Sequence, residues 1–217
     1  MNGFAQVQSI NLKPTFITER YKSSHRSDTR LLRRNQYLIH EGDLVERACI
    51  VVSGALKSHI NYCNGDSQVL GFHIPGDIIG HEALIHGPAF CSVIALDTSC
   101  VQFLDVSDAA TSEILIENMH NEIQRLTRQL HLERDYSTSA RLATFLLDYS
   151  QSQVESGYSR YEFILPMGRR DLAGYLGLAV ETLSRVFSRF RDQGVLSVNT
   201  NHVHILDPER LEAAVSL

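Results

Sequence analysis

The hydrophobic pattern of the chain changes near Asp105. Before this point, short runs rich in β-branched and aromatic residues are separated by turn residues such as Ser53-Gly54 and Pro75-Gly76-Asp77. Such runs predict short strands, and regular spacing of many short strands is typical of a sandwich or jelly roll. We expect strands at Gln36–His40, Ala48–Val52, Ala55–Asn61, Gln68–Ile74, Ser92–Ala95 and Cys100–Leu104. Before Leu31 the chain is mostly polar, which indicates a lead segment.

Residues 108–134 contain no Gly or Pro and are rich in Glu, Gln, Arg and Leu, which predicts one long helix. Five apolar residues in it alternate at spacings of three and four, which is the pattern of a two-stranded coiled-coil seam. They are Ile116, Met119, Ile123, Leu126 and Leu130. The pattern favours a homodimer, while a helix packed on its own domain stays open as the alternative.

The remaining residues, 137–217, change to a helical module. We expect a helix at Ala140–Gln151, a strand at Tyr161–Leu165, and then two short helices that cross at Gly177. Ala173 allows the two helices to approach closely, and Leu183 fills the angle between them. This is the helix-turn-helix pattern. The segments 194–198 and 202–206 complete it as a two-stranded wing.

Composition and sequence pattern add three limits. The chain of 217 residues carries 25 acidic and 20 basic side chains, a net charge of −5, so any nucleic-acid binding must rest on a local basic patch. Such a patch exists between Arg169 and Arg191, where five arginines face only Asp171 and Glu181. No run is long enough for a membrane span and no signal peptide is evident, so we expect a cytoplasmic protein. The four cysteines form no Cys-x-x-Cys pair, and we expect reduced thiols.

These elements predict an α+β protein with three parts: a lead segment and β jelly roll at 1–107, a dimerisation helix at 108–136, and a winged helix-turn-helix at 137–217. The stretches VVSGALKSH, GFHIPGDIIGHEAL, ALDTS and MGRRDLAGYLGLAVETLSRVFSRF occur in this order. Together they resemble the Crp/Fnr superfamily of bacterial transcription regulators, and its Fnr branch most. The resemblance runs from Leu31 to Leu206. It implies a cyclic-nucleotide-binding-like roll, a homodimer that binds double-stranded DNA, and contact with RNA polymerase through the exposed turn at 81–89.

The resemblance also shows which signals are disfavoured. Cyclic-AMP-binding members hold the ribose with a Gly-Glu pair and the phosphate with an Arg-Ser pair. Here the Glu position is His81, the Arg position is Cys91, and only Ser92 is retained. A buried phosphate without its guanidinium partner is poorly compensated, so cyclic AMP is not the expected effector.

Fnr-type iron–sulfur sensors use three N-terminal cysteines and one in the roll, whereas residues 1–48 contain no cysteine and the roll position is Gln102. The four ligands of such a cluster are therefore missing. His73, His81, Cys91 and Ser92 are the candidates for an effector pocket. Haem, a redox-active thiol, a small molecule or no effector at all stay open, and we assign no metal site.

In Fnr-like proteins the same pattern of Glu, Ser and Arg at the start of the second helix reads a TTGAT half-site, repeated as the palindrome TTGAT-N4-ATCAA. The matching base-reading residues here are Val180, Glu181, Ser184 and Arg185. Arg185 offers two donors to guanine and Glu181 accepts from a cytosine amine, although Arg185 could instead cap its helix or pair with a nearby acid. Phosphate contacts are expected from Arg169, Arg170, Thr182 and Arg189.

The sequence disfavours two other classes of function. A cupin-like metal enzyme needs a His-x-His followed closely by Glu within the roll, but the one His-x-His, at 202–204, lies in the wing. The sequence has no nucleotide loop, nucleophile motif or HExxH either, so we do not expect an enzyme. An interaction protein that has lost DNA readout is disfavoured because Glu181, Ser184 and Arg185 are intact.

Overall fold

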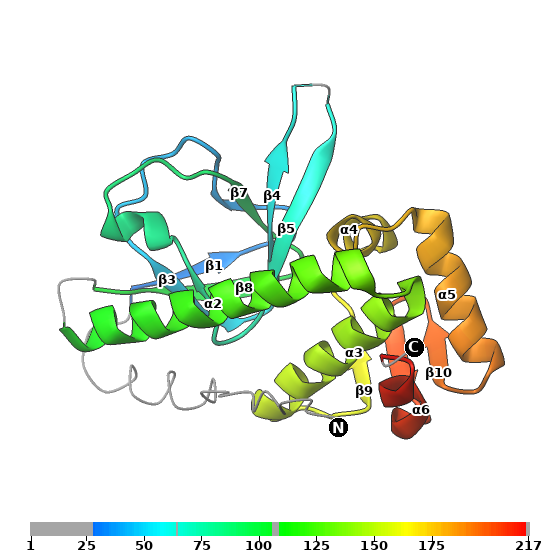
Figure 1. Cartoon of the computed structure of the whole chain (residues 1–217). Coiled ribbons are helices and arrows are strands. Elements are labelled where there is room, and N and C mark those ends of the chain that lie inside the picture. The colour runs from blue at the N-terminus through cyan, green and yellow to red at the C-terminus, as the bar shows by residue number, and fades with distance from the viewer. Residues whose placement is uncertain (1–27, 64, 106–108, 216–217) are drawn as a thin grey trace, which may run out of the picture.

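A computed structural model describes residues 28–63, 65–105 and 109–215 (Figure 1). Its N-terminal part consists of two four-stranded sheets in which the paired strands are antiparallel. The first sheet has the order β1 (Thr29–Leu32), β8 (Ser99–Phe103), β3 (Cys49–Ser53), β6 (Ile78–Ile79). The second has the order β2 (Tyr37–Ile39), β7 (Ser92–Ala95), β4 (Leu56–Asn61), β5 (Ser67–His73). The predicted strands are confirmed, with ends that differ by at most one residue.

The two sheets bury one shared apolar layer, because alternate side chains of each strand point inward. Leu32, Val51 and Val101 come from the first sheet, and Leu56 and Val93 from the second. The turn between β3 and β4 requires Gly54, which has φ +83° and no room for a Cβ against the Thr98 carbonyl. This architecture is the predicted β jelly roll.

The prediction of a lead segment up to Arg30 is wrong at its C-terminal end. Thr29 and Arg30 belong to β1, which pairs with β8. Their side chains are exposed and polar, so the hydrophobic pattern gave no strand signal, and only Leu32 of this strand is buried. Backbone hydrogen bonding at a sheet edge does not require apolar side chains. The rest of the predicted lead, residues 1–27, lies outside the described residues.

The long helix α2 (Ala109–Asp135) confirms the predicted helix at 108–134. Its first turns are fixed to the roll, because Ile114 and Leu115 pack with Ile50, Ile78 and Leu104. From there α2 runs along the roll to the C-terminal module (Figure 1). The short 3-10 helix η1 (His81–Leu84) lies on the roll after β6.

The C-terminal module contains α3 (Thr138–Glu155), β9 (Glu162–Ile164), α4 (Arg169–Tyr175), α5 (Val180–Asp192), β10 (Leu196–Asn199), β11 (His202–Ile205) and α6 (Pro208–Ala213). The wing has three strands and not two, because β9 also pairs with β11. Helix α6 was not predicted, although its start signals are present in the sequence. Asp207 accepts a hydrogen bond from the Arg210 N–H at 3.0 Å, and Pro208 opens the helix.

Candidate nucleic-acid interface

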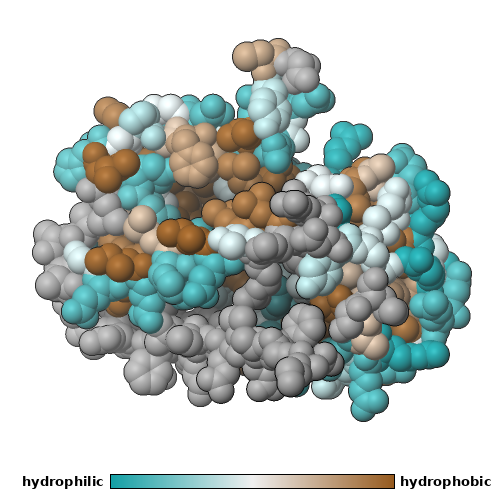
Figure 2. All heavy atoms as spheres, viewed as in Figure 1, coloured by the Kyte–Doolittle hydropathy of each residue, from teal (hydrophilic) through white to brown (hydrophobic). Residues whose placement is uncertain are grey.

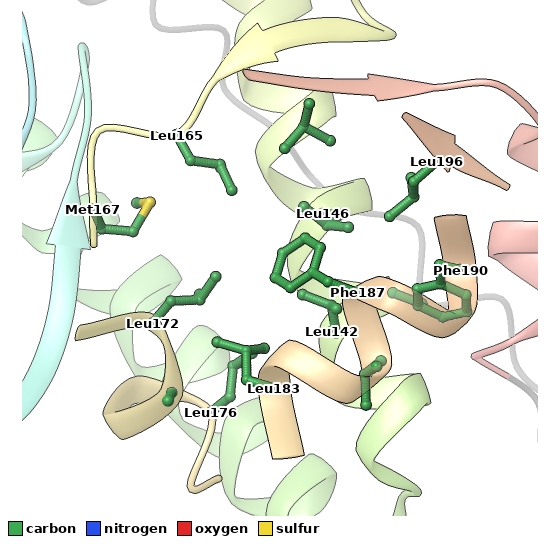
Figure 3. Close-up of a cluster of buried hydrophobic side chains, with 14 of the residues drawn as sticks. Leu142, Leu146, Leu165, Met167, Leu172, Leu176, Leu183, Phe187, Phe190 and Leu196 are labelled. Carbon is green, nitrogen blue, oxygen red and sulfur yellow. The ribbon is translucent and has the colours of Figure 1, made fainter. Parts of the chain in front are cut away.

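The helix-turn-helix is held by a dense apolar cluster (Figure 3). Leu172 of α4 is 1% exposed and Leu183 of α5 is fully buried. Leu142 and Leu146 of α3 belong to the same cluster, as does Phe187 of α5. The close approach expected at Ala173 is present, since this residue is also 1% exposed. The predicted packing of the two helices is therefore observed.

The turn between α4 and α5 depends on Gly177, which has φ +63°. A left-handed conformation after a helix is a common helix stop and favours glycine. The Leu178 N–H donates to the Ala173 carbonyl at 2.9 Å and closes this stop. Helix α5 then begins at Val180 after an extended Ala179 that makes no side-chain cap.

The predicted base-reading residues form one exposed row on α5. Glu181, Ser184 and Arg185 are exposed, and Val180 is half-buried at the first turn. Spacings of three and four place these side chains on one helix face. Arg185 Nε donates to the Glu181 carbonyl at 3.4 Å, so the guanidinium lies along this face. A row of donors and acceptors at the start of an exposed helix is what major-groove readout requires.

The four predicted phosphate contacts divide into two groups. Arg170 and Arg189 are exposed, and Thr182 is partly exposed. Arg189 also contacts the Ser139 hydroxyl at the start of α3. Ser139 was not predicted as a functional residue. Its signal in the sequence was the run Ser137-Thr138-Ser139, whose first member caps α3 by accepting from the Ala140 N–H at 3.2 Å.

Arg169 is placed differently from the other three. Its guanidinium carbon lies 3.6 Å from the centroid of the Phe187 ring. Its Nη2 donates to the Thr200 carbonyl of the wing at 3.1 Å, while Nη1 is buried without a hydrogen-bond partner. Burial lowers the pKa of this guanidinium below its ordinary value. Arg169 therefore ties the wing to α4 and α5, a structural role that the sequence did not indicate.

The predicted seam on α2 is largely uncovered in this chain. Ile116, Ile123 and Leu130 are 60–69% exposed, and Met119 and Leu126 are 39% and 43% exposed. Figure 2 shows apolar side chains in a row where α2 crosses the molecule. Beside this row, Glu122 and Arg125 of α2 form an ion pair at 2.8 Å, and Arg125 also donates to the Phe72 carbonyl of the roll. In the alternative, this row would pack on its own domain. That alternative does not agree with the exposure of these side chains.

The effector candidates lie in the roll, on or beside β5, η1 and β7. His73 of β5 is 7% exposed, and neither ring nitrogen has a hydrogen-bond partner. Burial lowers its pKa to about 4, with a smaller contribution from Arg125, so the ring is neutral at pH 7. His81 Nε2 lies 3.1 Å from the Asn118 Oδ1 of α2. These two histidines therefore mark the contact between the roll and α2.

Ser92 is the first residue of β7, and Cys91 directly precedes this strand. Ser92 Oγ accepts from the Glu41 N–H at 2.9 Å. Burial raises the pKa of the Cys91 thiol to about 12, and that of Cys49 also to about 12. A redox-active cysteine needs an accessible thiolate, which these two do not offer. Within the described ranges, no three His, Cys, Asp or Glu side chains are disposed to hold a metal ion.

Taken together, a β-roll, a long helix with an exposed apolar row and a winged helix-turn-helix with a free reading face define a DNA-binding regulator. A profile of the cyclic nucleotide-binding domain matches residues 29–111, and one of the Crp-like helix-turn-helix domain matches residues 140–214. The chain belongs to the Crp/Fnr family of transcription regulators. The relatives described in the next paragraph are transcription regulators. They confirm the prediction that this chain is a DNA-binding regulator and not an enzyme.

Three relatives illustrate the similarity. The transcriptional regulatory protein btr of Bordetella pertussis is 34% identical over 182 residues, which cover 80% of this chain and 75% of the relative. The transcriptional activator protein anr of Pseudomonas aeruginosa is 34% identical over 186 residues, or 82% and 76% of the two chains. The solved structure of FixK2 from Bradyrhizobium japonicum has a TM-score of 0.77 at 26% identity and covers 88% of this chain and 98% of that one. No described helix of this protein is long and apolar enough to cross a membrane.

Proposed function

We propose that this regulator acts in the cytoplasm as a homodimer that binds the palindrome TTGAT-N4-ATCAA through the exposed row on α5. The observation that supports this most is the geometry of Glu181, Ser184 and Arg185, which share one free helix face. Arg185 reads the guanine with two donors, and Glu181 accepts from a cytosine amine. Val180 and Ser184 face thymine edges and methyl groups.

The phosphate contacts are assigned from exposure. Arg170, Arg189 and Thr182 face solvent at least in part, and Ser139 adds a hydroxyl next to Arg189. Such groups fix the register of the protein on DNA and carry no sequence information. Arg169 contributes by holding the Thr200 end of the wing toward the DNA backbone.

The dimer is proposed to form through the exposed row from Ile116 to Leu130 on α2. Packing two such rows in a parallel coiled coil removes these side chains from water. It also relates the two α5 helices by a two-fold axis, as a palindrome requires. Two recognition helices about one DNA turn apart then enter successive major grooves.

The signal is proposed to be received where β5 and η1 meet α2, with His73 and His81 as the sensing residues. Cys91 and Ser92 are included because Glu82 of η1 and Glu122 of α2 also act on the Cys91 thiol. A buried imidazole with two unpaired nitrogens is a costly arrangement that a ligand could complete. Cyclic AMP does not fit, because the phosphate-binding arginine is replaced by the buried Cys91. The output is proposed to pass to RNA polymerase through the turn at 81–89, where Ile85 is 79% exposed.

The test of base reading compares two exposed arginines on the same helix. Arg185→Ala should abolish the preference for the guanine of TTGAT, which in the wild type is worth about 1–3 kcal/mol, or roughly 5- to 150-fold in affinity. The matched control, Arg189→Ala, should weaken binding to all sequences alike. Both are measured by fluorescence anisotropy on duplexes that differ at that base pair. An Arg185→Ala variant with an undiminished guanine preference, or a selected binding site without TTGAT-like symmetry, contradicts the proposal.

A further inference from the structure

The helix-turn-helix is docked on the β-roll by a polar contact between distant parts of the chain. Lys57 Nζ of β4 lies 2.7 Å from Asp171 Oδ1 in the first turn of α4. The two side chains are only 18% and 25% exposed. An ion pair that is mostly removed from water is screened less than a surface pair, and it depends strongly on geometry. The Lys57–Asp171 ion pair therefore favours one orientation of the helix-turn-helix on the roll over other orientations.

An aromatic cluster stands beside this ion pair. The Phe72 ring of β5 lies 5.1 Å from Tyr175 of α4 and 6.2 Å from Phe145 of α3, measured between centroids. Phe145 and Tyr175 are 5.9 Å apart in an edge-to-face arrangement. Such pairs contribute beyond their buried area. Phe72 is also part of the same apolar cluster as Leu172, so the core continues from the roll into the helix-turn-helix.

Helix α2, which carries the proposed dimer seam, contacts the same part of β5. Arg125 Nη1 of α2 donates to the Phe72 carbonyl at 3.4 Å. Strand β5 is thus in contact with both α2 and α4. Meanwhile the reading face of α5, with Glu181 and Arg185, is left exposed by this docking. The contact fixes the module without covering its DNA-binding surface.

We propose that Lys57 and Asp171, together with Phe72 and Tyr175, form an interdomain latch that fixes the orientation of the helix-turn-helix relative to α2. The latch sets the separation of the two half-sites that the dimer reads. This inference rests on the proposed palindrome binding. In a two-fold dimer, the second half-site is bound at an effective concentration that depends on how well the two reading helices are placed. A helix-turn-helix that the latch does not hold loses this gain in affinity for the palindrome, while its affinity for a single half-site is unchanged. Lys57, Asp171, Phe72 and Tyr175 are therefore positioning residues.

The test measures two DNA affinities for each variant. One duplex carries a single half-site, and the others carry the palindrome with the preferred spacer or with a spacer one base pair shorter or longer. Asp171→Lys places two cations together at the half-buried site. It should weaken binding to the preferred palindrome about 10-fold, flatten the spacer preference, and leave single half-site affinity within about 2-fold. Asp171→Asn should do the same more weakly.

Two controls isolate the latch. The double variant Lys57→Asp/Asp171→Lys restores an ion pair with reversed charges and should recover most of the spacer preference. Glu212→Lys makes the same charge change at an exposed position of the same module and should leave the spacer preference intact. If Asp171→Lys keeps the wild-type spacer preference, or weakens single half-sites and palindromes equally, the latch is refuted.

A measurement without DNA separates this proposal from the proposed function. Small-angle X-ray scattering of the free protein should show a larger maximum dimension for Asp171→Lys than for the wild type, and the charge-reversed double variant should return to the wild-type curve. Superimposable curves for the wild type and Asp171→Lys overturn the latch even if palindrome binding is confirmed. A wild type that does not distinguish palindromes from single half-sites refutes the proposed function, and the scattering result then decides the latch alone.

Discussion

His73 offers a prediction in which the sign and size of a pH effect follow from burial. The imidazole is 7% exposed, and both of its nitrogens lack partners. It faces Arg125 and Glu122 of α2 and His81 of η1. Burial lowers its pKa to about 4, with Arg125 adding to the shift. In the unfolded chain the same group has the ordinary pKa of about 6.5.

These two pKa values determine how stability depends on pH. Between pH 6.5 and 4 the unfolded chain binds a proton at this site and the folded protein does not, so the free energy of unfolding falls as the pH is lowered. At about 1.4 kcal/mol per pKa unit, the total loss is roughly 3 kcal/mol, of which about 2 kcal/mol falls between pH 7 and pH 5. His73→Leu removes this contribution, and at pH 7 it should be neutral or stabilising because it also removes two unpaired buried nitrogens.

The assay is urea unfolding at one fixed protein concentration, since a dimer's stability depends on concentration. The wild type, His73→Leu and the exposed control His204→Leu are compared at pH 7, 6 and 5. The difference between wild type and His73→Leu isolates this site, because other groups titrate in both proteins. The reasoning is refuted if His73→Leu loses stability on acidification as steeply as the wild type. It is also refuted if the variant is destabilised by more than about 2 kcal/mol at pH 7, since the ring would then make contacts worth that much.

Three further outcomes are expected. Leu126→Asp buries a charge in the proposed α2 seam and should convert the dimer to a monomer at micromolar concentration in sedimentation velocity, whereas an unperturbed dimer would disprove the seam. Arg169→Met replaces the guanidinium over Phe187 by an apolar side chain and removes the bond to the Thr200 carbonyl, so DNA affinity should fall several-fold on all sequences with little change in melting temperature. Calorimetry should detect no micromolar binding of cyclic AMP, because Cys91 stands where an arginine is needed.

The helix-turn-helix could be predicted because its requirements are local. Gly177 is needed for the left-handed turn, Ala173 for close approach and Leu183 for the angle, and all three lie within eleven residues. The β-roll was predicted nearly as well, since period-2 strands and turn residues are also local signals. Strand β1 was missed because its exposed polar residues carry no such period. Its pairing with β8 joins positions about 70 residues apart.

The contacts that could not be predicted connect residues distant in sequence. Nothing near Lys57 indicates that it pairs with Asp171, 114 residues later. The sequence likewise assigned Arg169 to phosphate by its charge, whereas the fold places it over Phe187 and against the wing. Residue type limits what such side chains can do, but the partner is chosen by the tertiary fold. Polar groups at domain contacts are therefore the least predictable part of this site.

Strand β5 connects the proposed signal site to the proposed latch. Phe72 and His73 are neighbours on it, and successive side chains of a strand point to opposite faces. Phe72 contacts Tyr175 of the helix-turn-helix, and His73 faces the Glu122 and Arg125 pair of α2. Arg125 in turn holds the Phe72 carbonyl. On the proposal that a ligand engages His73, we expect the contact between α2 and β5 to change, and with it the docking of the helix-turn-helix, because both contacts share β5. In this arrangement the proposed signal site and the DNA-binding module are coupled through a single strand, since β5 contacts both α2 and α4.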